Sequence, residues 1–181
     1  MSEDTIYRDS WGGKYEGSDG AVAKARVDFE HKFGDGYLPA LLSLASTLYS
    51  AAGNNFAKFS SLPKWQLITK FKLGFRAWRY LREAKKLARD FKKMIGGFAK
   101  MTADQLDIYQ SIMLRAGDVD EAFEACTIGL ERSNLSPDTR VLLLMGQARA
   151  MIALGENFVE YVNDTHQKAL DIIHKTKPTT Q

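Results

Sequence analysis

The chain has 181 residues, of which 45% are hydrophobic, and a formal net charge of +3 at pH 7. A chain of this length can bury about 70% of the surface that it exposes when unfolded, and the apolar content is typical of a globular protein. Cys126 is the only cysteine, so no intrachain disulfide can form and a disulfide-stabilised secreted scaffold is excluded.

The small net charge hides a strong asymmetry along the chain. Residues 58–100 hold 13 Lys and Arg side chains against two acids, Glu83 and Asp90, which gives a formal +11. The rest of the chain holds 12 cations and 20 acids, which gives −8. A segment with such an excess of one sign indicates an anionic partner, so we expect the basic segment to take part in binding.

The first 19 residues lack the apolar period of a helix or a strand, so we predict a flexible N-terminal arm over residues 1–19. Trp11 is unusual for a solvating tail. Two interpretations stay open: the arm folds back on its own domain, or Trp11 docks on another subunit. The start of the chain also lacks a basic region followed by an apolar run. We therefore expect no secretory signal and an intracellular location, in the cytoplasm or an organelle interior.

A first helix is expected to start at Asp19, a good N-cap residue, and to end at the glycines of residues 34–36. A second helix then covers residues 37–52 and stops at the Gly-Asn-Asn of residues 53–55. The segment 36–57 holds no charged residue and is the nearest approach to a membrane span. Its apolar part covers only about four turns, so we predict a buried helix, with a membrane-inserted segment as the alternative.

The third helix is the longest and the most basic, covering residues 63–95 with Pro63 at its first position. One face carries an apolar residue at alternating spacings of four and three: Leu73, Ala77, Tyr80, Ala84, Leu87, Phe91 and Met94. A second stripe begins with aromatic residues and continues with cations: Phe71, Phe75 and Trp78, then Arg82, Lys86, Arg89 and Lys93. The C-terminal half of this basic amphipathic helix therefore needs one packing neighbour, whereas the N-terminal half needs two.

Four kinds of neighbour can cover the aromatic stripe. The simplest is the helix of residues 37–52, lying across Phe71, Phe75 and Trp78. The alternatives are another protein or a second copy of the chain, an anionic membrane surface, and nucleic acid, because basic helices with interleaved aromatics serve all three. Most cations of the helix lack an acidic residue one turn away. We therefore predict that six of them contact an acidic or anionic partner: Arg76, Arg79, Arg82, Lys86, Arg89 and Lys93.

Four shorter helices are expected in the rest of the chain. Thr102 and Gln105 form a capping box at the start of the fourth helix, and Pro137 suits the first turn of the sixth. The expected bounds are 102–116 for the fourth helix, 119–133 for the fifth, 137–155 for the sixth, and up to about residue 175 for the last. The chain is predicted to be all-α, with six or seven helices and no sheet. It divides into the arm, the helices of residues 20–100, the helices of residues 101–176 and a loose tail, residues 177–181.

Residues 103–173 alternate large and small packing positions in a regular way. Large residues lie at Leu106, Tyr109 and Met113, and small or medium ones at Ala122, Cys126 and Gly129. A second unit starts at Thr139 and contains the pair Met145–Gly146, and Gly146 lies 36 residues after the corresponding Gln110. This spacing resembles the tetratricopeptide repeat, with Gln110 where that family has glycine and Arg149 where it has an aromatic residue. The resemblance implies antiparallel helical hairpins in a right-handed α-α array; an unrelated antiparallel bundle is the alternative.

The small residues of these hairpins should let the helices approach closely. We expect a core formed by Leu106, Met113, Ala122, Cys126, Leu130, Leu143, Gly146, Ile152 and Leu170. Chemistry-bearing motifs are absent from the sequence: it has no glycine-rich phosphate loop, no H-E-x-x-H and no C-x-x-C. His166 and His174 share one helix face but are expected to be surface residues rather than metal ligands. We therefore expect neither enzymatic activity nor a bound cofactor or metal.

These observations leave three function classes. The first is a non-catalytic protein–protein interaction or scaffold subunit of a larger assembly, with another protein or a second copy as the partner. The second is a peripheral membrane protein that binds an anionic bilayer through the helix of residues 63–95. The third is a ribonucleoprotein subunit. The partner-binding residues expected from the sequence are the aromatic and basic stripes described above, together with Trp11.

Overall fold

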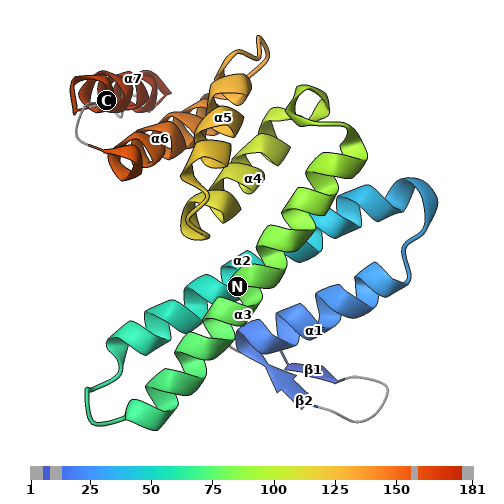
Figure 1. Ribbon diagram of the computed structural model, residues 1–181. Coiled ribbons are helices and arrows are strands. Elements are labelled where there is room, and N and C mark those ends of the chain that lie inside the picture. The colour runs from blue at the N-terminus through green and yellow to red at the C-terminus, as the bar shows by residue number, and fades with distance from the viewer. Residues whose placement is uncertain (1–5, 9–13, 156–158, 177–181) are drawn as a thin grey trace, which may run out of the picture. The chain divides into compact units, whose positions relative to one another are not determined.

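The computed structural model describes residues 6–8, 14–155 and 159–176, and it is predominantly helical (Figure 1). Seven α-helices occur within these residues, which confirms the expectation of a helical protein. The chain divides into two compact units, Met1–Met94 and Ile95–Gln181. The expected absence of a sheet is wrong, because two three-residue strands, β1 (Ile6–Arg8) and β2 (Lys14–Glu16), pair antiparallel with Tyr7 opposite Tyr15. Trp11 lies outside the described residues.

The first unit contains three long helices: α1 (Gly17–Glu30), α2 (Tyr37–Ser61) and α3 (Leu67–Ile95). A single turn of 3-10 helix, η1 (Gly34–Gly36), joins α1 to α2, and the β1–β2 ribbon packs against α1. Helix α1 begins two residues before its expected N-cap. Asp19 instead lies in its first turn, where a negative side chain complements the helix dipole.

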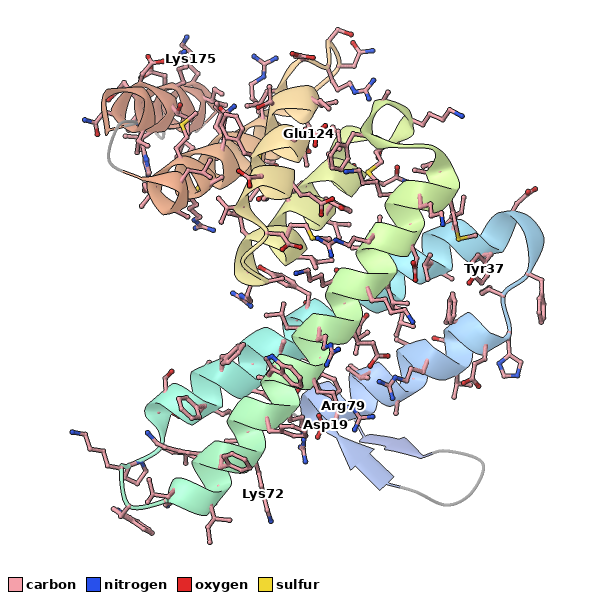
Figure 2. The ribbon with its side chains drawn as sticks, viewed as in Figure 1. Asp19, Tyr37, Lys72, Arg79, Glu124 and Lys175 are labelled. Atoms are coloured by element: carbon pink, nitrogen blue, oxygen red, sulfur yellow. The ribbon has the colours of Figure 1, made fainter. Side chains whose placement is uncertain are left out.

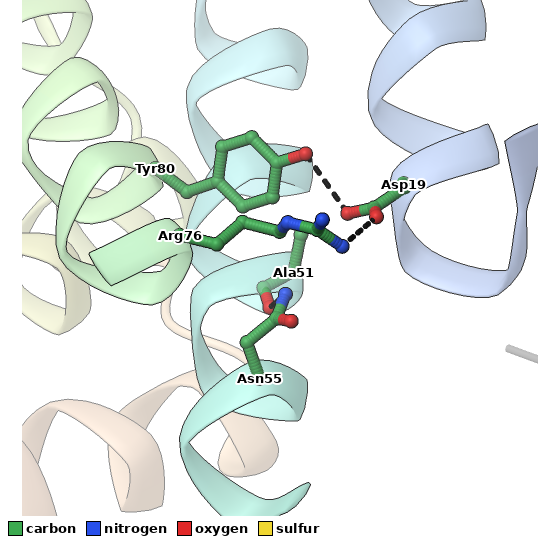
Figure 3. Close-up of polar contacts among 5 residues, drawn as sticks. All are labelled: Asp19, Ala51, Asn55, Arg76 and Tyr80. Atoms are coloured by element: carbon green, nitrogen blue, oxygen red, sulfur yellow. Dashed lines mark hydrogen bonds and ion pairs between the residues drawn. The ribbon is translucent and has the colours of Figure 1, made fainter. Parts of the chain in front are cut away.

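Helix α2 does not stop at the Gly-Asn-Asn of residues 53–55, as the sequence indicated, but continues to Ser61. Asn55 is buried inside the unit, and its Nδ2 donates a hydrogen bond of 2.8 Å to the carbonyl of Ala51 one turn earlier (Figure 3). A glycine or asparagine in a helix costs at most about 1 kcal/mol relative to alanine. Burial of neighbouring residues such as Ala51 and Ala52 outweighs this cost, so the helix continues.

Helix α3 begins at Leu67 rather than at Pro63, because residues 63–66 form a turn in which the Gln66 amide donates to the Pro63 carbonyl (3.1 Å). Its buried side is rich in alanine, and Phe91 at its far end is fully buried. Most of the expected apolar face is confirmed: Ala77, Ala84 and Phe91 are buried, Leu73, Tyr80 and Leu87 are half-buried, and only Met94 is exposed.

Polar contacts fix the direction of α1 relative to α3. Asp19 accepts hydrogen bonds from Arg76 and from the Tyr80 hydroxyl (2.9 Å) (Figure 3). Arg26 pairs with Glu83 at 2.6 Å. A step of seven residues along α1, from 19 to 26, matches a step of seven along α3, from 76 to 83. The two helices therefore run in the same direction, with α2 antiparallel to both.

The second unit contains α4 (Ala103–Arg115), α5 (Val119–Leu130), α6 (Pro137–Leu154) and α7 (Val159–Thr176), preceded by a 3-10 turn, η2 (Phe98–Lys100). Each α-helix packs on the next, and α4 also packs on α6. The capping box of Thr102 and Gln105 is confirmed, as are the start of α6 at Pro137 and its end before Gly155.

The core of the second unit agrees with most of the expected residues. Five of them are fully buried: Leu106, Met113, Ala122, Cys126 and Leu143. Gly146 is also buried, and Leu130 is half-buried. Two expectations are wrong, since Ile152 is 62% exposed and Leu170 is 43% exposed. The neighbouring residues Ala150 and Met151 are buried instead, so α6 places a different side of its last turns against the unit.

Candidate functional site

The surface that stands out lies on the solvent side of α3 in the first unit. Ile68, Phe71, Phe75 and Trp78 are spaced three, four and three residues apart and are 75%, 75%, 57% and 51% exposed. At 100° per residue they point about 140° around the helix axis from the buried residues of α3, and they extend about 15 Å along it. We call these four residues the outer stripe. An exposed apolar row of this kind is a candidate surface for binding.

The side chains of the outer stripe contact one another. The rings of Phe71 and Phe75 are stacked with centroids 6.5 Å apart, and Phe75 and Trp78 lie tilted at 6.0 Å. The guanidinium of Arg82 lies 5.4 Å from the Trp78 ring centroid, within range of a cation–π contact. Arg82, the first cation on the same side of the helix, is thus in contact with Trp78, the last aromatic residue of the outer stripe.

The same face of α3 becomes basic after Trp78. Arg82, Lys86, Arg89 and Lys93 continue the outer stripe at the same helical positions, and all four are exposed. We call them the basic stripe. Acidic residues are missing from the whole of residues 36–82, which hold seven cations: Lys58, Lys64, Lys70, Lys72, Arg76, Arg79 and Arg82. Lys72 and Arg79 lie on α3 beside the outer stripe (Figure 2). An apolar row among the cations of this segment can bind a partner that is both apolar and negatively charged.

The expectation that the helix of residues 37–52 covers Phe71, Phe75 and Trp78 is wrong, because all three are at least half exposed. Helix α2 instead approaches α3 through Phe59, whose ring lies where α3 has Gly74: a Cβ on that glycine would be 3.5 Å from the ring. Lys70 also contacts the Phe59 ring, with its Nζ 5.2 Å from the ring centroid. The buried face of α3 accounts for its packing within the first unit, and the described residues of this unit leave the outer stripe exposed.

Further exposed apolar residues, which the sequence pattern had not indicated as part of a site, lie next to the outer stripe at the turn between α2 and α3. Trp65 is 78% exposed, Leu67 is 71% exposed, and Ile68 belongs to the outer stripe itself. The spacing contains a signal for Ile68, which lies three residues before Phe71, in step with Phe75 and Trp78. Trp65 lies in the turn before α3, where a helical period does not apply.

The six cations predicted to bind a partner have different surroundings. Arg76 forms an ion pair with Asp19 inside the unit, so the fold itself supplies an acid to this cation. Arg82 lies on Trp78, and Arg79, Lys86, Arg89 and Lys93 are exposed. The predicted aromatic residues Phe71, Phe75 and Trp78 lie together with these cations on one face of α3.

Three ionisable groups have shifted pKa values, and each is explained by burial. Burial, followed by the hydrogen bond to Asp19, raises the pKa of Tyr80 to about 12. Burial, followed by the charge of Asp107, raises the pKa of the Cys126 thiol to about 12. Burial also raises the pKa of Asp107. In each case burial is the largest cause, because it disfavours the charged form of the group.

The part of the chain that the structure describes holds no group of three or more His, Cys, Asp or Glu residues that could bind a metal ion. His166 and His174 are exposed on α7. Among the described helices, none is both long and apolar enough to cross a membrane, α2 included. Comparison with known proteins finds no matching family model, no matching curated protein and no matching solved structure.

Proposed function

We propose that the chain is a peripheral membrane protein that binds an anionic bilayer through the outer stripe and the basic stripe of α3. One observation carries this proposal: the exposed face of α3 is aromatic and aliphatic over its first three turns and carries four exposed cations over the next three. Helices that lie in a membrane interface combine Trp, Phe and Leu on the buried side with Lys and Arg that reach phosphate groups.

The magnitudes favour a bilayer that is anionic rather than neutral. An exposed Phe or Trp side chain that enters the interface contributes about 1 to 2 kcal/mol, because part of its surface is already covered. Each cation near an anionic leaflet contributes about 1 kcal/mol. The outer stripe alone would therefore bind marginally, much as a single acyl chain does, and stable binding needs the cations of the basic stripe as well.

Vesicle flotation tests the proposal. We expect the full chain to float with vesicles that contain phosphatidylserine and to float weakly with phosphatidylcholine alone. The triple variant Phe71→Ser, Phe75→Ser, Trp78→Ser should lose flotation while its circular dichroism stays unchanged, because these side chains are exposed. Phe33→Ser is the matched control, since Phe33 is an aromatic residue of the same unit that is 83% exposed and follows α1. Absence of flotation by the parent chain would overturn the proposal.

The outcomes also separate the other partners that the sequence allowed. A chain that does not bind vesicles and instead forms dimers through the outer stripe would have twice the mass of one chain in light scattering. The triple variant would then be monomeric. A chain that binds RNA and no vesicles would lose affinity steeply with salt. Either result rules out membrane binding as the role of α3.

A scaffold subunit is a second candidate, and the observation in its favour lies in the second unit. Four apolar residues there are 42% to 62% exposed: Leu142, Ile152 and Leu154 on α6, and Leu170 on α7. A second copy of the chain that covers these residues would extend the α4–α7 stack by further helices, as tetratricopeptide-like units do. Light scattering tests this candidate: a monodisperse monomer that stays monomeric at high concentration would exclude it.

A further inference from the structure

We infer that the end of the α2–α3 hairpin, residues 62–68, enters the bound leaflet as a short wedge, with α3 tilted so that its first turn lies deepest and its basic stripe still faces the lipid, so that the protein selects strongly curved or loosely packed bilayers. This inference rests on the proposed membrane binding and specifies how the same surface meets the lipid. The first observation is a gradient of exposure along α3. It rises from 51% at Trp78 and 57% at Phe75 to 75% at Phe71 and Ile68, and to 78% at Trp65.

The apolar surface also widens towards the turn. At Trp78 only one side of α3 exposes apolar surface to solvent, because the neighbouring residues are the buried Ala77 and the cation Arg79. At the start of α3, Leu67 and Ile68 are both exposed and point about 100° apart, and Trp65 precedes them in the turn. A helix that lies flat on a membrane needs one apolar side. An end that is apolar on several sides fits insertion of the end itself.

Charges are distributed as this orientation requires. Between Phe59 and Thr69 the only charged residue is Lys64. Cations then follow directly behind the apolar end, with Lys58 on α2 and Lys70 and Lys72 on α3. Figure 2 labels Lys72 near the start of α3. Lys72 is five residues from Leu67, or about 7 to 8 Å along the helix axis. That distance matches the depth of about 5 to 10 Å to which interfacial elements sink, so these cations would lie at the lipid phosphates.

The wedge is formed before any membrane is present. The Leu62 amide donates to the Lys58 carbonyl at 3.2 Å, and the Lys70 amide donates to the Gln66 carbonyl at 3.0 Å. These bonds close both sides of the turn, and Pro63 restricts its backbone further. Phe59 packs at Gly74 just behind the turn and holds α2 against α3. The apolar end therefore keeps its width on binding and does not spread along the surface.

The consequence is a preference for particular membranes. A rigid wedge of this depth separates the headgroups of one leaflet and does not reach the other. Such insertion is easiest where headgroups are already spread apart, which is the case on small vesicles and in bilayers with conical lipids. A flat basic helix, in contrast, depends mainly on the density of anionic lipid and little on vesicle diameter.

The experiment compares vesicles of one composition, 20% phosphatidylserine in phosphatidylcholine, at diameters of about 30 nm and about 200 nm. At equal accessible lipid, we expect several-fold tighter binding to the small vesicles. The variant Trp65→Ser, Leu67→Ser, Ile68→Ser should bind both sizes equally and weakly, whereas Phe33→Ser should behave as the parent chain does. Equal binding of the parent to both sizes would overturn the wedge and leave the proposed function standing; binding to neither would remove both.

Fluorescence gives a second test of the same inference. In a chain with Trp11→Phe and Trp78→Phe, Trp65 is the only tryptophan left. We expect its emission to shift to the blue on small anionic vesicles, and to be quenched by lipids that carry bromine in the upper acyl chain. Iodide in the water phase quenches an exposed tryptophan. If this quenching were the same with and without bound vesicles, the turn would stay outside the bilayer and the wedge would be wrong.

Discussion

Gly146 lies directly against the side-chain amide of Gln110, so that a Cβ placed on residue 146 would be 2.9 Å from Nε2 and 2.7 Å from Cδ of Gln110. The two residues face each other where α4 packs on α6 in the second unit. Gln110 is 4% exposed, and its Nε2 donates to Asp107 (2.9 Å) and to Ser111 (3.0 Å). The amide is therefore held in place, and the glycine is what lets α6 approach it.

Gly146→Ala should destabilise the second unit for this reason. The added methyl group must displace a buried, hydrogen-bonded amide, and overpacking of this kind costs about 1 to 3 kcal/mol. Gln110→Ala should restore part of the loss in the double variant, because it removes the group that the methyl meets. Urea unfolding followed by circular dichroism measures both effects. Gly146→Ala that is as stable as the parent would contradict the close approach.

Gly74→Ala is the matched control in the first unit. A Cβ at residue 74 would lie 3.5 Å from the Phe59 ring, which is ordinary contact. The substitution should therefore stabilise α3 by about 0.5 to 1 kcal/mol through helix propensity alone. The same change of residue type thus has opposite signs at the two positions, and only the packing around each glycine accounts for the difference.

Local signals in the sequence predicted element boundaries well wherever side-chain chemistry determines them. Thr102 and Gln105 form the expected capping box, and Ser136 accepts the hydrogen bond of the Thr139 amide at the start of α6. The same kind of signal failed at residues 53–55. Glycine and asparagine weaken a helix locally, but Asn55 satisfies its own amide on the Ala51 carbonyl and is buried by neighbours that the local sequence does not reveal.

Burial was harder to predict than helix position. Ile152 and Leu170 were expected in the core, yet both are exposed. Helix α6 has apolar residues around most of its circumference, so periodicity cannot tell which side meets α5 and α7. Phe71, Phe75 and Trp78 pose the same problem in α3. The sequence identified the aromatic stripe, and only the arrangement of α2 and α3 decided that it faces solvent.

Ala122→Phe tests the packing of α5. Ala122 is fully buried, so a phenyl ring would have to push α5 away from its neighbours, at a cost of about 1 to 3 kcal/mol. Glu124→Phe introduces the same side chain two residues away, at an exposed position of the same helix (Figure 2), and should leave the melting temperature nearly unchanged. Equal melting temperatures for the two variants would mean that α5 does not pack through Ala122.

Tyr80 should make stability fall in strong alkali. Its pKa is raised to about 12 in the folded chain from the ordinary 10.0, so the protonated form is favoured by folding. This contribution is complete below pH 10 and is lost as the pH rises from 10 to 12. Because Tyr80 is only half-buried, solvent screening limits the effect to about 1 kcal/mol.

Comparison of Tyr80→Phe with the parent chain isolates this effect from that of Cys126, which titrates over an overlapping range in both proteins. The variant loses the 2.9 Å hydrogen bond to Asp19 and should be about 0.5 to 1.5 kcal/mol less stable at pH 7. The difference between the two proteins should shrink from pH 10 to pH 12 in urea unfolding. A constant difference would show that folding does not raise the pKa of Tyr80.

Cys126 should be chemically silent in the folded protein. Its thiol is fully buried and has a pKa raised to about 12, so the reactive thiolate is almost absent at pH 8. Iodoacetamide should therefore modify the chain only as fast as the second unit opens, and the rate should rise with urea well below the unfolding midpoint. Fast modification at pH 8 without urea would show that α5 does not bury this residue.

Charge reversal on α3 separates binding from stability. Arg79, Arg82 and Lys86 are exposed cations, and Arg82 also contacts the Trp78 ring. We expect Arg79→Glu, Arg82→Glu, Lys86→Glu to abolish flotation with phosphatidylserine vesicles and to change the melting temperature little, because three repulsions then replace three attractions at the lipid surface. Arg140→Glu together with Arg149→Glu, two exposed cations of α6, is the control and should leave flotation intact.

A large loss of melting temperature in the α3 variant, with vesicle binding undetectable in the parent chain, would mean that acids of the same chain neutralise these cations. Arg76, which already pairs with Asp19, shows what such internal neutralisation looks like.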